Sequence, residues 1–136
     1  MTDSRSDVAD SANIEIVRRF CEAWSDLDLD LIMAFFTEDA VFHNIPVDPA
    51  QGKEAIRATI AGYTDGVQKV EERILHILGD GQVVMTERIV VFSYPGATIE
   101  LPVMGIFELR DGLVSSWRDY FDMNQFTSQL PTPPPG

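Results

Sequence analysis

The sequence predicts an α+β domain in which helices come first and a mainly antiparallel sheet follows. Apolar residues recur at helical spacing through the first third of the chain and again near residues 53–63. Four apolar segments rich in β-branched residues come next, and short breaks rich in Gly, Asp and Pro separate them. Because the strands follow the helices instead of alternating with them, the helices should gather on one face of the sheet.

The expected helices are justified in chain order by caps and spacing. After a disordered lead over residues 1–10, a first helix should be capped by Asp10 or Ser11. The apolar side chains with helical spacing in that segment are Ile14, Val17, Phe20, Cys21 and Trp24. A second, short helix is expected from Asp28, with Leu31, Ile32, Phe35 and Phe36 as its apolar residues. Gly52 precedes a third helix over residues 53–63, whose inward residues are Ala55, Ile56, Ile60 and Tyr63.

The expected strands follow from β-branched runs and from turn residues. Residues 40–46 predict an early strand, and the Pro-containing segment 46–49 must be a loop. The later strands are expected at 69–78, 82–93, 97–109 and 113–122. The breaks between them, Gly79-Asp80-Gly81, Pro95-Gly96 and Asp111-Gly112, are typical of hairpins. Strands this long indicate a sheet curved enough to wrap a cavity.

The end of the chain completes the domain organisation. A short helix is possible from Asn124, and residues 129–136 read as an extended, mobile, Pro-rich tail. The sequence contains no internal repeat and no second domain. We therefore expect a single domain over residues 11–128.

Composition and charge narrow the classes of function. A chain of 136 residues with 45% hydrophobic and 24% charged residues suits one globular core. A net charge of −12 argues against nucleic acid or an anionic membrane as partner, because both favour basic surfaces. The single cysteine, Cys21, excludes an intramolecular disulfide. The sequence lacks an apolar run of about 20 residues and a signal-peptide core, so a cytoplasmic location is expected.

Three polar side chains interrupt apolar strand faces. In the segment 113–122, Asp119 shares a face with Trp117 and Phe121, because side chains alternate along a strand. By the same alternation, Arg88 shares a face with Val84, Val90 and Phe92, and Asn44 shares one with Phe42. A carboxylate or guanidinium on a buried face needs a partner, because burying a bare charge is costly. Arg88 and Asp119 are therefore natural partners.

Two interpretations of this trio remain open. Asn44, Arg88 and Asp119 could form a buried network that only fixes strand register, since Arg–Asp pairs occur in cores. They could instead be the convergent polar groups of an apolar ligand cavity. We favour the cavity, with apolar walls formed by Trp24, Phe42, Val90, Phe92, Leu101, Val103 and Phe121.

Other residues are weaker candidates for a functional site. His43 should point away from Asn44, His76 can face either way, and neither stands in a metal-ligand pattern, so no metal is expected. The sequence has no Gly-x-Gly-x-x-Gly or Walker pattern, so no nucleotide cofactor is expected. The run Glu71-Glu72-Arg73 reads most simply as a solvated strand start. Alternatively, Glu72 reaches the mouth of the pocket.

These segments resemble the limonene-1,2-epoxide hydrolase family. The matching segments, in order, are Phe42–Pro46, Thr86–Arg88, Gly105–Phe107 and, most specifically, Trp117–Asp122, within a resemblance that covers residues 12–128. The resemblance implies the cone-shaped fold of nuclear transport factor 2 and of SnoaL-like polyketide cyclases. Many such proteins dimerise through the sheet, so it also implies a homodimer.

The resemblance further implies one-step opening of an epoxide by water, without a covalent intermediate. Asp119 matches the aspartate that takes a proton from water, Arg88 the arginine that links two carboxylates, and Asn44 the asparagine that holds the water. Two positions depart from the pattern: the family's tyrosine is Phe42, and the aspartate that protonates the epoxide is Val90.

Loss of this acid matters because a positioned general acid contributes about 100- to 10,000-fold to a rate. Val90 has no proton to donate, and the permanently charged Arg88 is a very poor donor. The sequence therefore leaves three readings open. The first is a hydrolase of a small apolar epoxide, terpenoid, steroid-like or polyketide-derived, with Asp119 as base, Arg88 as electrostatic stabiliser and Glu72 as a possible replacement acid. The others are a non-catalytic binder and a SnoaL-like isomerase or cyclase. A ketosteroid-isomerase mechanism is disfavoured, because its aspartate would fall near Asn44.

Overall fold

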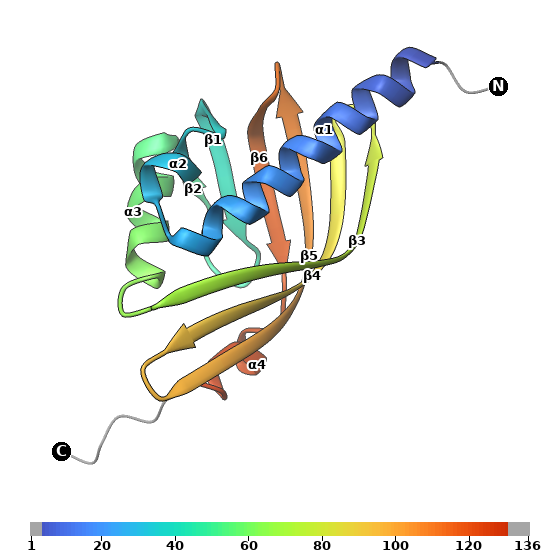
Figure 1. Cartoon of the computed structure of the whole chain (residues 1–136). Helices are drawn as coiled ribbons and strands as arrows, with labels where there is room; N and C mark the ends of the chain where they lie inside the picture. Colours follow the sequence, from blue (N-terminus) through green and yellow to red (C-terminus); the bar gives the residue numbers. More distant parts are fainter. Residues whose placement is uncertain (1–3, 131–136) are drawn as a thin grey trace.

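The computed structural model describes residues 4–130, with side chains from residue 11 onward, and it confirms the α+β class (Figure 1). The helical elements are α1 (Ser4–Ala23), the 3-10 turn η1 (Trp24–Asp26), α2 (Leu29–Met33), α3 (Lys53–Tyr63) and α4 (Met123–Thr127). The strands are β1 (Phe36–Asn44), β2 (Ala50–Gln51), β3 (Lys69–Asp80), β4 (Val83–Tyr94), β5 (Ala97–Arg110) and β6 (Leu113–Tyr120). Each of the four later strands overlaps the segment expected for it.

Within the described residues, the strands form one sheet in the order β2-β1-β6-β5-β4-β3. The β1–β6 pair is parallel and the other neighbours are antiparallel, so the sheet is mixed. Strands β3, β4 and β5 bend along their length, and α1 crosses them on the concave side (Figure 1). Helix α3 packs against β1, so the helices close the same face of the sheet.

A bulge helps to curve the sheet at β3. The register between β3 and β4 shifts between Ile74 and His76, which leaves Leu75 as an extra residue. Bulges bend a strand and change which residues face the core. Val70 and Ile74 face inward before the bulge, and Ile77 does so after it. The predicted curvature is therefore present, although the sequence shows no signal for the bulge that contributes to it.

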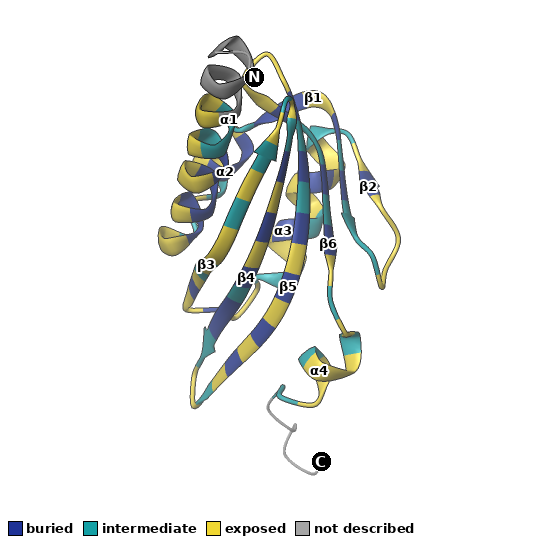
Figure 2. Ribbon diagram, turned by 90° about the vertical axis from the view of Figure 1, so that its right-hand side faces the viewer, coloured by how far each residue is buried: buried dark blue, intermediate teal, exposed yellow. Residues whose placement is uncertain are grey.

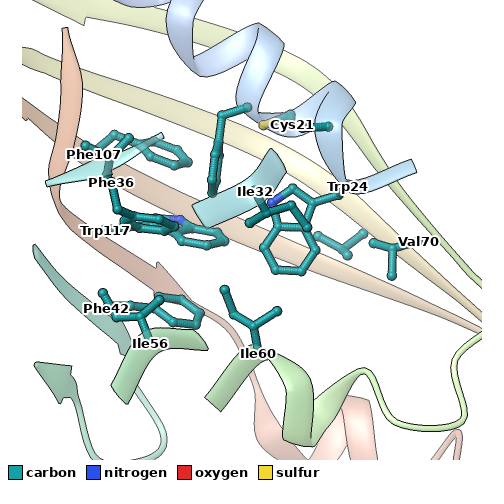
Figure 3. Close-up of a cluster of buried hydrophobic side chains, with 14 of the residues drawn as sticks. Cys21, Trp24, Ile32, Phe36, Phe42, Ile56, Ile60, Val70, Phe107 and Trp117 are labelled. Atoms are coloured by element: carbon teal, nitrogen blue, oxygen red, sulfur yellow. The ribbon is translucent and has the colours of Figure 1, made fainter. Parts of the chain in front are cut away.

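An aromatic cluster packs among the buried hydrophobic side chains between α1 and the sheet (Figure 3). Phe20 of α1 contacts Phe36, Phe107 and Trp117 edge to face at centroid distances between 4.9 and 5.9 Å. The Trp117 ring is stacked between Phe42, at 4.3 Å, and Phe107, at 5.4 Å. Such packing fixes the rotamer of Trp117 and gives the neighbouring site a rigid, apolar wall.

Several boundaries differ from the sequence expectation. Helix α1 begins at Ser4 instead of at a cap on Asp10 or Ser11, so the backbone of residues 4–10, expected to be a disordered lead, is helical. Phe36, expected in the second helix, begins β1 because it pairs with Val114 of β6, and this tertiary pairing overrides local helical spacing. Strand β6 ends at Tyr120, two residues earlier than expected.

The start of the expected tail is held against the sheet. The Gln129 side chain donates to the Glu100 carbonyl at 2.9 Å and accepts from the Glu100 N–H at 3.1 Å. Residues 131–136, the rest of that tail, lie outside the described residues. Among the helices in the described part of the chain, none is long and apolar enough to cross a membrane.

Candidate active site

Three strands, β3, β4 and β6, place polar residues close together on the concave face, and β5 lies between β4 and β6. In the sheet register, Gly105 of β5 lies between Asp119 of β6 and Thr86 of β4. Arg88 follows Thr86 on the same face of β4, and Glu72 of β3 is its diagonal neighbour. Alternation along each strand therefore brings a guanidinium and two carboxylates together from residues far apart in the chain.

Arg88 is fully buried and uses all three guanidinium nitrogens. Nη2 donates to Asp119 Oδ2 at 2.7 Å, and Nε donates to Glu72 Oε2 at 2.6 Å. Nη1 donates to Thr86 Oγ1 at 2.7 Å. The expected Arg88–Asp119 pair is therefore present, and Arg88 also binds a second carboxylate, which fixes both acids in space.

Asp119 is oriented from two sides. The indole Nε1 of Trp117 donates to Oδ1 at 2.8 Å, while Arg88 binds Oδ2. The Asp119 backbone carbonyl accepts a hydrogen bond from the Ile45 N–H at 2.9 Å, which ties it to the end of β1. Because the aromatic cluster immobilises Trp117, the position of this carboxylate is set by the core.

Gly105 supplies the space in which the ion pair forms. A Cβ atom at this position would lie 2.2 Å from Arg88 Nη1, 2.6 Å from Asp119 Oδ1 and 2.9 Å from Thr86 Oγ1. Real Cβ atoms do not approach other heavy atoms so closely. The absent side chain of Gly105 therefore lets the guanidinium on β4 reach across β5 to the carboxylate on β6.

Glu72 is a functional candidate, although its sequence context was interpreted most simply as a solvated strand start. Its side chain is 5% exposed and faces the cavity, whereas Glu71 and Arg73 lie on the outer face and pair with each other at 3.0 Å. Burial, together with the nearby Asp119, raises the pKa of Glu72, although Arg88 opposes the shift. The alternation Val70–Glu72–Ile74 is the sequence signal that could have placed it inward.

The two carboxylates open onto a cavity of about 240 Å³ with mainly apolar walls. The residues expected to line it that do so are Trp24, Asn44, Val90, Phe92, Leu101, Val103, Asp119 and Phe121. Further lining residues are Val47, Thr59, Tyr63, Val70, Glu72, Trp117, Met123 and Phe126. Two expected residues do not line it: Phe42 is stacked on Trp117 in the core, and Arg88 lies behind the carboxylates.

Two aromatic residues add polar atoms near the cavity. Tyr63, at the end of α3, stacks on Trp24 with ring centroids 6.2 Å apart. Burial and the charges of Glu72 and Asp119 raise the pKa of Tyr63 well above its usual value, so its hydroxyl stays protonated. Trp24 Nε1 is buried and has no hydrogen-bond partner among the described residues.

The remaining candidates lie elsewhere. His43 Nε2 lies 2.8 Å from the Val47 carbonyl oxygen, and His76 Nδ1 lies 2.8 Å from Glu87 Oε1 on the exposed outer face. Cys21 is buried in the core, and burial raises the pKa of its thiol. Among the described residues, no group of three His, Cys, Asp or Glu side chains is placed to hold a metal ion.

Comparison with known proteins identifies the family of this chain. A family model described as a SnoaL-like domain matches residues 17–117. The epoxide hydrolase EphG of Mycobacterium tuberculosis is 32% identical over 107 residues, which cover 79% of this chain and 71% of that protein.

Solved structures agree with these sequence matches. A limonene-epoxide-hydrolase-like epoxide hydrolase of M. tuberculosis superposes with a TM-score of 0.78 at 28% identity, covering 89% of this chain and 90% of that chain. A putative polyketide cyclase of Xanthomonas campestris has a TM-score of 0.81 at 22% identity, covering 89% and 98% of the two chains. The second similarity concerns the fold alone, and together they confirm the expected cone-shaped, nuclear-transport-factor-2-like architecture.

Proposed function

Because this chain belongs to the SnoaL-like domain family, among the relatives of limonene-1,2-epoxide hydrolase, we propose that it hydrolyses small apolar epoxides to diols. The observation that carries the proposal is the buried Arg88–Asp119 ion pair at the wall of an apolar cavity. An apolar cavity with a few convergent polar groups is the usual form of a small-molecule site.

Asp119 is the general base in this proposal. Its carboxylate lines the cavity, and the Trp117 and Arg88 hydrogen bonds hold it in one orientation. Asn44 lies directly across from Asp119 in the parallel β1–β6 register and lines the same cavity. A water molecule held by the amide and the carboxylate loses a proton to Asp119 as its oxygen attacks an epoxide carbon.

Arg88 acts from behind the reacting groups. Its guanidinium is fully buried and contacts the substrate cavity only through the carboxylates that it binds. A fixed positive charge in a region from which water is excluded stabilises negative charge more strongly than it would in water. Arg88 thereby orients the acids and stabilises the charge that develops as the epoxide ring opens.

The cavity favours a small substrate. Its volume of about 240 Å³ is below the range of roughly 300–1,000 Å³ typical of pockets for drug-sized ligands. Phe92, Leu101 and Val103 offer it no hydrogen-bonding groups. A terpenoid or styrene-type epoxide therefore fits the proposal better than a steroid-sized one.

Turnover in isotopically heavy water tests the proposal. A panel of cyclic terpenoid and styrene-type epoxides is incubated with the protein in ¹⁸O water, and labelled diol is measured by mass spectrometry. We expect labelled diol from the unchanged protein and a loss of at least about 100-fold in Asp119→Asn. Asp111→Asn, in the exposed turn between β5 and β6, is the matched control and should keep full activity.

The same experiment separates the other readings. If the panel stays inert while its members raise the melting temperature, the protein is a binder, because a ligand selective for the native state stabilises it. In a parallel incubation in deuterium oxide, exchange of carbon-bound hydrogen without diol would indicate the isomerase or cyclase reading instead. Either result contradicts the hydrolase.

A homodimer formed through the outer face of the sheet is part of the proposal. Large apolar residues on that face are exposed in the single chain: Leu75, Leu78, Met85, Met104 and Tyr120. Met104 and Tyr120 are direct neighbours across β5 and β6, so the exposed surface is continuous there. Sedimentation should give a dimer that Met104→Glu dissociates, whereas a monomeric unchanged protein would contradict this assembly.

A further inference from the structure

We propose that Glu72 is the proton donor of this site and replaces the carboxylate that Val90 does not supply. This inference rests on the proposed hydrolase function and adds a catalytic residue to it.

The register places Glu72 beside the position that lacks an acid. Glu72 of β3 and Val90 of β4 are direct partners across the antiparallel pair, and both line the cavity. Neighbouring strands lie about 4.8 Å apart, and Glu is one methylene longer than Asp. A carboxylate moved by one strand can therefore still reach the guanidinium of Arg88, which it contacts at 2.6 Å.

The environment of Glu72 differs from that of its neighbours in the chain. Glu71 and Arg73 satisfy each other on the exposed outer face, so solvation explains both of them. Glu72 is buried against Arg88 although a buried carboxylate is costly. Its Oε2 accepts from Arg88, and its Oε1 has no hydrogen-bond partner among the described residues. The unpartnered oxygen belongs to a side chain that lines the cavity.

The two acids are held differently, and this difference decides which of them carries a proton. With both ionised, Glu72 and Asp119 would place two negative charges around one guanidinium in a buried site, which favours uptake of a proton. Asp119 accepts a hydrogen bond at each oxygen, from Trp117 and Arg88. Glu72 accepts only one, and burial and Asp119 raise its pKa. The proton therefore belongs on Glu72.

These roles give a balanced reaction. The water oxygen bonds to an epoxide carbon and releases a proton to Asp119, while the ring C–O bond breaks and its oxygen takes the proton of Glu72. One epoxide and one water become one diol. The step leaves Asp119 protonated and Glu72 ionised, and return of a proton from Asp119 to Glu72 through cavity water restores the starting state.

The test substitutes Glu72→Gln, which keeps a hydrogen-bond acceptor for Arg88 but removes the acid. We expect kcat to fall by about 100- to 10,000-fold, as for loss of a positioned general acid, with little change in KM. The matched control is Glu71→Gln, the same change one residue away on the outer face, which should keep wild-type kcat.

Rescue and pH dependence distinguish a catalytic acid from a merely structural residue. In the unchanged protein, kcat should fall as rising pH ionises Glu72, and Glu72→Gln should lose this basic limb. Adding Val90→Asp to Glu72→Gln should restore part of kcat, because it returns a carboxyl group to the neighbouring strand. Glu72→Asp, which keeps an ionisable group, should retain the basic limb at a reduced rate.

The outcomes separate the two proposals. An unchanged protein that is inert on the whole epoxide panel overturns both the hydrolase function and the role of Glu72. An active protein whose Glu72→Gln variant keeps wild-type kcat and the basic limb overturns the role of Glu72 alone. Should Glu72→Gln fail to fold, a Glu72→Asp variant without a basic limb contradicts the proposal in its place.

Discussion

Strand β3 carries a glutamate on each face, and the two glutamates lie in different environments. Glu71, on the outer face, is exposed, and the hydrogen bond from Arg73 lowers the pKa of its carboxyl group. Glu72, on the inner face, is buried, and burial raises the pKa of its carboxyl group although Arg88 binds it. Adjacent glutamates therefore differ in the direction of their pKa shifts because a strand directs them to opposite sides.

The same division runs along the neighbouring strands, where buried and exposed residues alternate (Figure 2). On β4, Thr86 and Arg88 face the cavity side, while Met85 and Glu87 face outward. Polar groups on the outer face are solvated and contribute little to stability, whereas those on the inner face are locked into one network. Changes to the inner face should therefore be costly and matched changes to the outer face mild.

Loss of Arg88, on the inner face, should have the largest effect on the stability of the protein. Arg88→Met leaves Glu72 and Asp119 buried without their shared cation, which should lower the free energy of unfolding by about 3–5 kcal/mol. Arg73→Met, on the outer face, should change it little, because that pair is solvent-exposed. Urea denaturation of both variants measures the difference. Similar midpoints of denaturation for the two variants would show that the inner and outer faces do not differ in this way.

Filling the space at Gly105 should have the next largest effect. In Gly105→Ala the new Cβ meets Arg88 and Asp119, so the free energy of unfolding should fall by about 1–3 kcal/mol and diol formation should be lost. Gly62→Ala, in α3, meets no atom within 4 Å and should stabilise the protein by about 0.5–1 kcal/mol. Thermal melting measures both, and a Gly105→Ala protein of unchanged stability would contradict the packing described.

The pH dependence of stability should show the smallest effect, with opposite signs for the two glutamates. A raised pKa means that folded Glu72 holds its proton more tightly than the unfolded chain does, so its contribution is complete below 4.5 and is lost as pH rises above that value. A lowered pKa means that the contribution of Glu71 is present above 4.5 and is lost as pH falls.

Denaturation at a series of pH values, with Glu72→Gln and Glu71→Gln beside the unchanged protein, measures these contributions. The unchanged protein should lose the contribution of Glu72 to stability as pH rises above 4.5, and Glu72→Gln should not show this loss. The unchanged protein should lose the contribution of Glu71 as pH falls below 4.5, and Glu71→Gln should not show that loss. Equal pH profiles for the two variants would show that the faces do not differ as described.

Local patterns were sufficient to predict much of the fold and half of the ionic network. Turn residues such as Pro95-Gly96 and Asp111-Gly112 located the hairpins, because their backbone preferences are local. Arg88 and Asp119 were recognisable because each interrupts an apolar row, and an interrupted row is visible in one segment.

The rest of the fold and of the site depends on contacts between distant segments, which a local pattern does not predict. The bulge at Leu75 ends the two-residue period that places Val70, Glu72 and Ile74 inward. The alternation gives the face of Glu72, but its position beside Val90 and Arg88 depends on the β3–β4 register. The two-residue strand β2 is too short to give a pattern. Phe42 was expected at the cavity, yet stacking on Trp117 draws it into the core, and such packing depends on the whole aromatic cluster.

Titration of Glu71 and Glu72 by carbon-13 NMR compares the two faces of β3 at adjacent residues. The side-chain carboxyl carbons are followed with pH, and the Glu71→Gln and Glu72→Gln variants assign their signals. The unequal environments of the two faces predict a midpoint below 4.5 for Glu71 and above 4.5 for Glu72. A Glu72 midpoint at or below that of Glu71 would contradict a protonated acid poised beside Arg88.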